Sequence, residues 1–247
     1  MPEGHTIQAM INNTEPKQAL EEYTGEQFLE WLHNFVAGEV RSWPELKSMA
    51  SANPKIEKAR KFMLQRFLAA EAFFGGRDGD PGFLGFAAAN LSESNDPLAE
   101  SALENLEKKR QDEAVGAKRA LWLKLLHALG ASDEEIKRSE PKELTRNYIA
   151  ELSDVYSNSE WQTAMGALVA YERSLPEENL ILSEMLGKIS GVSGDDLAIL
   201  KAPQATPHIL DKIAFDQENK NLVWEGVQRQ LAARHEFYKG LFKYLEG

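Results

Sequence analysis

The chain has 247 residues and a formal net charge of −11, and 43 % of its residues are hydrophobic, which is the composition of a folded globular protein. The excess of negative charge argues against a nucleic-acid-binding surface, because neutralising phosphates needs clustered Lys and Arg. Since cysteine is absent, disulfides, thiolate metal sites and a cysteine nucleophile are excluded. No apolar run approaches ~18 residues and the N-terminus lacks a secretory pattern, so we expect a cytoplasmic protein with no membrane span.

Helical periodicity, caps and stops predict a series of helices in the first half of the chain. The signals are the capping box Thr24-Gly-Glu-Gln27, the start Asn53-Pro54, the stop Gly75-Gly76, a loop over 80–85 before a short apolar helix ending at Leu91, and the start Asp96-Pro97 of a charged helix. We expect this charged helix, 97–113, to be an insertion, and residues 1–23 to form a peripheral segment.

The second half of the chain shows the same kinds of signal. They predict helices over 118–129, after the capping box Ser132-Asp-Glu-Glu135, over 141–156, over 161–174 capped by Ser159, over 176–189, and from Thr206-Pro207 toward the C-terminus. No convincing period-two run or Asn-Gly hairpin indicates a strand. No linker divides the chain, so the prediction is one all-α domain, 1–247.

Three polar residues near the C-terminus, Lys212, Asp216 and Asn219, would lie within about 60° of one another on a helix. The same face carries the branched apolar residues Ile209, Val223 and Val227. A surface stripe would not be bracketed in this way, so we expect the three polar side chains to point inward. Buried ionisable groups then indicate a structural charge network or the floor of a site.

Two other predicted helices repeat this pattern. Lys118 shares its stripe with Trp122 and Leu125, and Glu172 continues the apolar series through Met165 and Leu168. Two ammonium groups and two carboxylates would then meet inside one bundle with their charges cancelled, as a buried cluster requires. The alternative is that the lysine at the start of its helix reaches solvent and that the glutamate, in a last turn, reaches water.

Four segments, taken in order, resemble the haem-oxygenase-like, iron-containing redox enzymes. The segments are Asn90-Leu-Ser-Glu93, Lys118-Arg-Ala-Leu-Trp-Leu with Ala128-Leu-Gly130, Ala170-Tyr-Glu172, and Lys212-x3-Asp216-x2-Asn219. That superfamily also holds thiaminase II, the final oxidase of pyrroloquinoline quinone synthesis and the chlamydial protein associating with death domains. The resemblance covers roughly residues 55 to 235, and it implies a single bundle of about seven to nine helices with a central pocket.

The departures from that pattern concern the metal ligands. Lys118, Lys212 and Asn219 stand where the resemblance leads one to expect histidines, and an ammonium group has no lone pair to give a metal. The oxygen donors that remain are Glu93, Glu172 and Asp216. Iron sites of this type rely on imidazole, so we expect no cofactor, with iron on these three carboxylates as the fallback. The two lysines could supply the positive charge that the carboxylates require.

Three hypotheses for function follow from the residues and the resemblance. The first is a metal-free enzyme, a cofactorless oxidase or lyase, with Lys212 as base or imine-forming nucleophile and Glu172, Asp216 and Lys118 as the other catalytic residues. The second is a non-catalytic relative that binds an organic ligand or a protein, and the third is a non-haem iron oxidase with an oxygen-rich site.

The partner expected in the first two cases is a small organic ligand. The predicted pocket residues are Trp122, Leu125, Met165, Leu168, Ile209 and Asn219. The superfamily is compatible with a homodimer, although no residue pattern in this chain indicates one. Substrate identity is not encoded in these residues, because bundle pockets select by shape.

Overall fold

The computed structural model describes residues 14–75, 81–112, 115–201 and 216–246. Within these ranges the chain is helical and contains no strand. The helices are α2 (Pro16–Glu22), α3 (Gly25–Ser42), α4 (Pro44–Ser51), α5 (Ile56–Phe74), α6 (Gly82–Glu93), α7 (Pro97–Asp112), α8 (Val115–Ala128), α9 (Asp133–Arg138), α10 (Glu143–Asn158), α11 (Trp161–Leu186), α12 (Ala198–Lys201) and α13 (Gln217–Phe242). The number of described helices exceeds the seven to nine expected, because short helices such as α9 and α12 add to the long ones. None of the described helices is long and apolar enough to cross a membrane.

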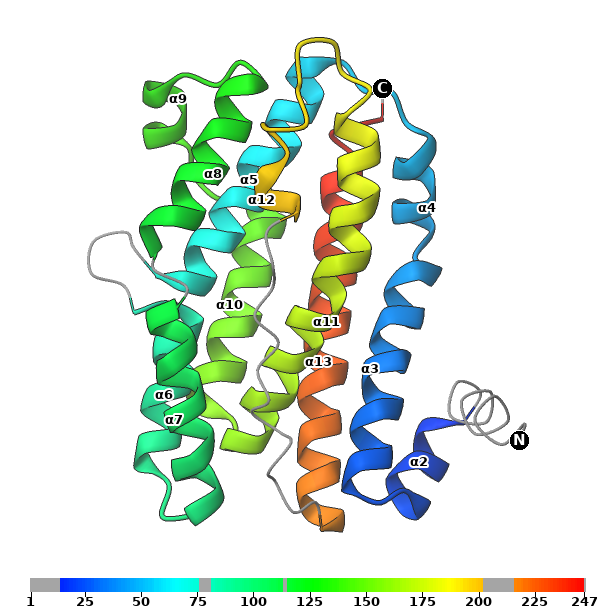
Figure 1. The fold of residues 1–247 in the computed structure, drawn as a ribbon, viewed down its shortest axis with the longest axis vertical. Helices are drawn as coiled ribbons and strands as arrows, with labels where there is room; N and C mark the ends of the chain where they lie inside the picture. The colour runs from blue at the N-terminus through cyan, green and yellow to red at the C-terminus, as the bar shows by residue number, and fades with distance from the viewer. Residues whose placement is uncertain (1–13, 76–80, 113–114, 202–215, 247) are drawn as a thin grey trace.

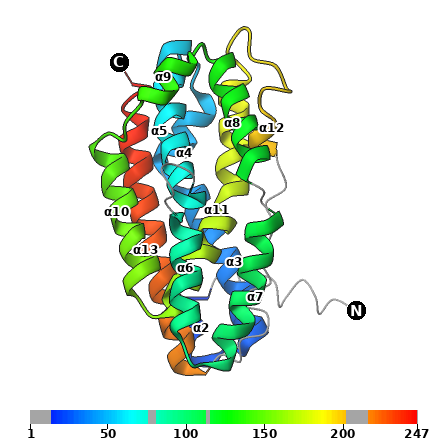
Figure 2. The same cartoon turned by 90° about the vertical axis from the view of Figure 1, so that its left-hand side faces the viewer.

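The helices form an elongated bundle in which most axes follow the long direction of the molecule (Figure 1). In the view turned by 90°, α6 continues below α5, and α8 lies above α7 (Figure 2). The parallel pair α11 and α13 runs along the middle of the bundle, with α3 on one side and α10 on the other (Figure 1). The buried apolar side chains of these helices pack together in one continuous core.

Two glycines bring α11 and α13 unusually close together. A Cβ atom at Gly166 would overlap the backbone carbonyl of Val223, and one at Gly226 would overlap the backbone carbonyl of Thr163. Each glycine therefore faces the backbone of the other helix, with no room for a side chain. This contact fixes how the two central helices cross at their N-terminal ends.

Several predicted helix signals are confirmed. Thr24 forms a capping box with Gln27 at the start of α3, and the Ser132 hydroxyl accepts a hydrogen bond from the backbone of Glu135 at the start of α9. Gly75, with φ 76°, ends α5 as its C-cap. These local signals were reliable because each satisfies backbone groups that a helix end leaves open.

Other boundaries were predicted wrongly. The break at Pro176 is absent, since α11 runs unbroken from Trp161 to Leu186 with the proline inside it. A proline in a helix removes one hydrogen bond, and here the burial of α11 along its length outweighs that loss. The helix α6 already begins at Gly82, within the loop expected over 80–85. The start predicted at Thr206 lies outside the described residues, and α13 begins at Gln217.

Candidate ligand-binding site

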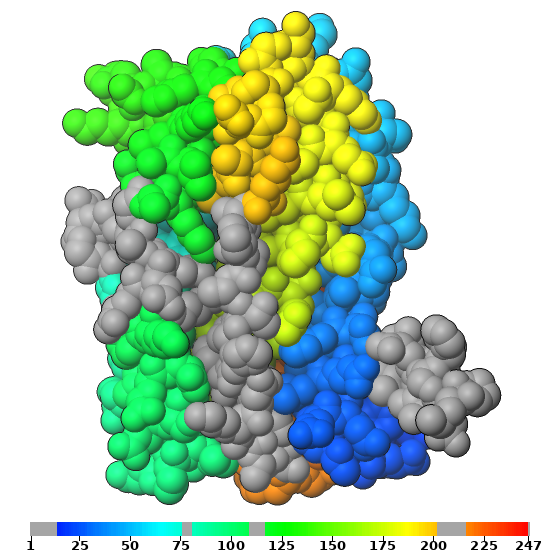
Figure 3. Space-filling view, viewed as in Figure 1, coloured from blue at the N-terminus to red at the C-terminus, as the bar shows by residue number. Residues whose placement is uncertain are grey.

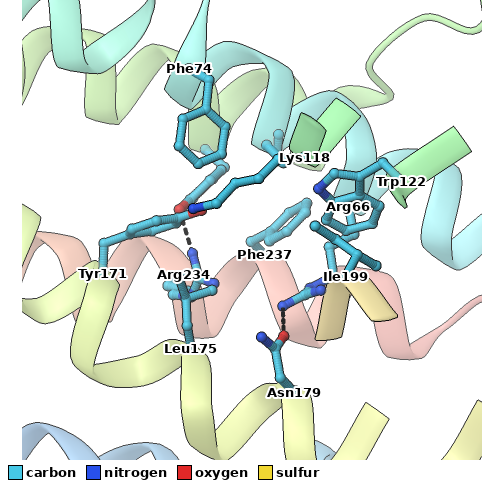
Figure 4. A pocket seen from close by; sticks show the side chains of 13 residues that line it. Arg66, Phe74, Lys118, Trp122, Tyr171, Leu175, Asn179, Ile199, Arg234 and Phe237 are labelled. Atoms are coloured by element: carbon cyan, nitrogen blue, oxygen red, sulfur yellow. Dashed lines mark hydrogen bonds between the residues drawn. The ribbon is translucent and has the colours of Figure 1, made fainter. Parts of the chain in front are cut away.

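A small cavity of about 40 Å³ lies between α5, α8, α11 and α13. Three cationic side chains reach it: Arg66 from α5, Lys118 from α8 and Arg234 from α13. Aromatic side chains make up much of the remaining wall, namely Phe74, Trp122, Tyr148, Tyr171 and Phe237. Figure 4 shows the lysine reaching from α8 toward Tyr171 and Arg234. A cavity of this size has room for about three water molecules.

The short helix α12 closes one side of this cavity. It lies between α8 and α11 on the face seen in Figure 3, where its atoms fill the space between the two longer helices. Its Ile199, which is 5 % exposed, lines the cavity. The cavity wall thus combines one isolated turn of helix with residues from five longer helices, α5, α8, α10, α11 and α13.

Beside the cavity, the carboxylate of Glu178 is at the centre of a buried ion cluster. Glu178 is 0 % exposed. Arg234 donates from Nε to Oε1 and from Nη2 to Oε2, the second bond at 2.6 Å. Arg66 donates from Nη2 to Oε2 at 3.3 Å, and the Tyr238 hydroxyl donates to the same oxygen at 2.7 Å. One carboxylate of α11 therefore joins α5 to α13 through hydrogen bonds.

The pKa values in the cluster reflect this mutual stabilisation. Burial alone would raise the pKa of Glu178, but hydrogen bonds and charges from Arg234 and Arg66 hold it below its usual value. Burial alone would lower the pKa of Arg234, but the negative charge of Glu178 raises it well above its usual value. Burial raises the pKa of Tyr171, so its hydroxyl keeps its proton. The cluster is thus two guanidinium cations around one carboxylate anion.

The remaining polar contacts at the cavity use the same two arginines. Arg66 donates from Nε to the Tyr238 hydroxyl at 3.0 Å and from Nη2 to Asn179 Oδ1 at 2.8 Å. Arg234 donates from Nη1 to the Tyr148 hydroxyl at 2.9 Å, and its guanidinium lies 4.6 Å from the centre of the Tyr171 ring. Figure 4 draws the bond from Arg66 to Asn179 as a dashed line. Both guanidiniums are therefore held in fixed orientations.

The structure brings two of the predicted site residues to this cavity. Lys118 and Trp122 line it, the ammonium nitrogen of the lysine is buried, and that nitrogen lies 5.2 Å from the centre of the Phe74 ring. Glu172 points inward as predicted, at 5 % exposure, in the middle of α11 rather than in a last turn, but it does not line the cavity. The catalytic roles assigned to these side chains stay predictions.

The other predicted pocket residues lie elsewhere or beyond the described ranges. Leu125, Met165 and Leu168 are fully buried core residues that do not line the cavity. Asn219 accepts a hydrogen bond from Gln162 at 2.8 Å, at the far end of the α11–α13 pair. Lys212 and Ile209 lie outside the described residues, so the positions predicted for these two side chains are not tested.

Asp216 does not have the inward orientation that the helical spacing predicted. It is exposed and serves as the N-cap of α13, where its Oδ1 accepts a hydrogen bond from the backbone N–H of Asn219 at 2.8 Å. The prediction was wrong because it assumed that one helix runs through residues 212–219, whereas α13 begins only after the aspartate. An N-cap side chain turns back toward the backbone N–H groups of the first turn, so it does not point to the apolar face that the helical spacing assumed.

A metal ion needs several donor side chains close together. Among the described residues, no three His, Cys, Asp or Glu side chains lie close enough together to hold an ion. Of the fallback ligands, Glu93 and Asp216 are exposed, whereas Glu172 is buried. The described residues therefore do not fit an iron centre of the oxygen-rich kind.

The ion cluster escaped prediction although its signal was present in the sequence. Glu178 stands between Leu175 and Leu182 at helical spacing, and Arg234 stands between Leu231 and Tyr238 in the same way. A charged residue inside an apolar stripe is the signal that identified Lys118. Applied to the last predicted helix, it would have selected Arg234, whereas the predicted break at Pro176 hid the position of Glu178 within one continuous helix.

Comparison with solved structures defines the class of fold. A domain of unknown function from Shewanella denitrificans, described as having a heme oxygenase-like fold, aligns with a TM-score of 0.69 over 90 % of this chain and 94 % of that one, at 11 % identity. A TenA homologue from Pseudomonas syringae aligns with a TM-score of 0.67 over 93 % and 98 %, at 12 % identity. A CADD-like protein of unknown function from Nostoc punctiforme aligns with a TM-score of 0.65 over 97 % and 94 %, at 14 % identity. The chain therefore has the haem-oxygenase-like fold, and the predicted resemblance is confirmed.

Sequence comparison finds two partial similarities. Residues 82–197 match the sequence model of the TENA/THI-4/PQQC family. A protein named 4-aminobenzoate synthase from Nitrosomonas europaea is 28 % identical over 170 residues, which is 64 % of this chain. The match spans 65 % of the length of that relative.

Proposed function

We propose that this chain binds a small organic molecule in the cavity between α5, α8, α11 and α13. The observation that carries the proposal is the composition of the cavity wall, in which Arg66 and Arg234 are held rigidly beside aromatic rings. Ligand pockets in proteins combine such apolar surfaces with a few fixed polar groups. Fixed donors of this kind can also stabilise negative charge that develops on a substrate oxygen, so the same site could support catalysis.

Narrowing the cavity tests this proposal. Ala70 lines the wall, so Ala70→Val places two additional methyl groups there. We expect a panel of small organic acids, amides and amines to contain compounds that raise the melting temperature of the natural chain. We expect those compounds to bind the variant at least about tenfold more weakly, a loss of roughly 1.4 kcal/mol.

The matched control is Ala89→Val, which adds the same two methyl groups at an exposed position of α6. It should bind the same compounds with unchanged affinity in isothermal titration. The proposal fails if no compound in the panel binds, or if binding is equally strong in the Ala70 variant.

The named relative supports a second candidate, formation of 4-aminobenzoate. The similarity to 4-aminobenzoate synthase covers 170 residues at 28 % identity. Expression of this chain in a bacterial strain unable to make 4-aminobenzoate should then restore growth without supplement, with the compound detected by mass spectrometry. Growth that still requires added 4-aminobenzoate, at an equal level of folded protein, would contradict this candidate. The Ala70→Val variant should restore growth less well if the cavity is the site of the reaction.

A further inference from the structure

The polar groups at the cavity are almost all hydrogen-bond donors. The Tyr148 hydroxyl already accepts bonds from Arg234 at 2.9 Å and from Gln230 at 3.3 Å, so its own proton is left to donate. The Tyr171 hydroxyl lines the cavity and has no hydrogen-bond partner among the described residues. Of the described residues that line the cavity, none is a carboxylate.

Arg66 supplies the strongest of these donors. A guanidinium carries five N–H groups. Its Nε donates to Tyr238, and its Nη2 donates to Asn179 and Glu178. Within the part of the chain that the structure describes, Nη1 has no protein partner, and the residue is only 5 % exposed at the cavity wall. This nitrogen faces a cavity with room for about three water molecules, so its partner there is water or a ligand that displaces the water.

The charges of the ion cluster favour an occupant of negative sign. Two guanidiniums share the single carboxylate of Glu178, which leaves one positive charge uncompensated within the cluster. A buried charge without compensation is costly, and a bound anion removes that cost. The Trp122 ring, whose centre is 5.5 Å from the Arg66 guanidinium carbon, provides an apolar surface next to this charge.

From these contacts we infer that the cavity binds a carboxylate, with the acid group accepting hydrogen bonds from Arg66 Nη1 and from the hydroxyls of Tyr148 and Tyr171. A guanidinium N–H forms a strong, charge-assisted hydrogen bond with a carboxylate, and Nη1 is the nitrogen of Arg66 that the protein contacts leave for it. The cavity of about 40 Å³ has the size of the acid group itself, so a larger acid must displace part of the wall. This inference rests on the proposed function and names the class of ligand.

The experiment compares acids with neutral molecules of the same shape. The binding of acetate and benzoate is compared with that of acetamide and benzamide, each followed by calorimetry and by the change in fluorescence between the natural chain and Trp122→Phe. We expect the acids to bind at least about tenfold more tightly than the amides, because only the acids bring a negative charge to the hydrogen bond with the Arg66 guanidinium.

Tyr171→Phe tests the geometry without disturbing the ion cluster. The variant keeps the ring that stacks on Phe73 at 3.9 Å and lies under Arg234, and it removes only the hydroxyl. We expect roughly 10–100-fold weaker binding of acids and little change for amides. The matched control is Tyr156→Phe, which removes a buried hydroxyl with no partner among the described residues, from a side chain that does not line the cavity. It should bind acids as the natural chain does.

The outcomes separate this inference from the proposed function. Equal or tighter binding of the amides would overturn the inference and leave a small-molecule cavity in place. Unchanged acid binding in Tyr171→Phe would also overturn it, because the hydroxyl would then not contact the ligand. If neither acids nor amides bind, both the inference and the proposed function fail.

Discussion

Replacing Glu178 by Gln is expected to destabilise the folded chain by about 3–5 kcal/mol, because the change strands two buried guanidiniums. The carboxylate is 0 % exposed and accepts hydrogen bonds from both Arg66 and Arg234. A neutral amide presents one oxygen instead of two and cannot balance either positive charge. Urea unfolding followed by circular dichroism would measure the loss as a lower midpoint concentration.

The adjacent residue offers the matched control. Glu177 also pairs with an arginine, Arg41 at 3.5 Å, but its side chain is 24 % exposed and that of the arginine 60 %. Ion pairs this accessible to water contribute at most about 1 kcal/mol, so Glu177→Gln should have a small effect. Equal losses in the two variants would show that Glu178 does not have the role assigned to it.

The effect of Glu178 should also depend on pH in a defined direction. Its pKa in the folded chain lies below the ordinary value of 4.5, because Arg234 and Arg66 favour the ionised form. The stability that it contributes is therefore fully present above about pH 4.5 and is lost as the pH falls through the lower folded pKa. The difference in stability between the natural chain and the Gln variant should shrink over that acidic range.

Gly226→Ala is expected to cost about 3 kcal/mol or more, at the upper end of what overpacking costs, because the added methyl group meets backbone atoms rather than mobile side chains. The Cβ atom would overlap the carbonyl of Thr163, and relief requires α11 and α13 to move apart. For a chain of this length, such a loss corresponds to a fall in melting temperature of roughly 6–12 °C, measurable by calorimetry.

Gly38→Ala is the control for the intrinsic effect of the substitution. Gly38 lies in α3, and no atom lies within 4 Å of the place where its Cβ would be. Alanine favours helix over glycine by about 0.5–1 kcal/mol, so this variant should be slightly more stable than the natural chain. A Gly226 variant that behaved in the same way would disprove the close contact of the two helices.

The sequence predicts the fold class well because its strongest signals are local. The capping boxes at Thr24 and Ser132 satisfy helix ends within four residues, so no tertiary information is needed to recognise them. Pro176 shows where such reasoning fails. Its local effect favours a break, but the side chains around it are buried against the rest of the bundle, and this packing is not visible in a local pattern.

The site could be predicted only in part. Lys118 and Glu172 interrupt apolar stripes, and the inward orientation predicted for them is correct. The orientation predicted for Asp216 was wrong because it depends on where a helix begins. Helix boundaries are the least certain part of a sequence-based prediction. Arg66, Glu178 and Arg234 meet from three helices far apart in the sequence, so spacing within one helix could not show that they form a cluster.

Two sets of contacts hold α11 against α13, namely the glycine contact near Gly166 and the ion cluster at Glu178. Twelve residues of helix separate them, which corresponds to about 18 Å, so side chains at one place do not touch those at the other. The crossing of the two helices is set by backbone atoms alone at the first place. Cavity-facing residues outside the ion cluster, such as Leu175 and Ile199, can therefore be exchanged over evolution, and a new ligand accommodated, while the contacts between the two helices are kept.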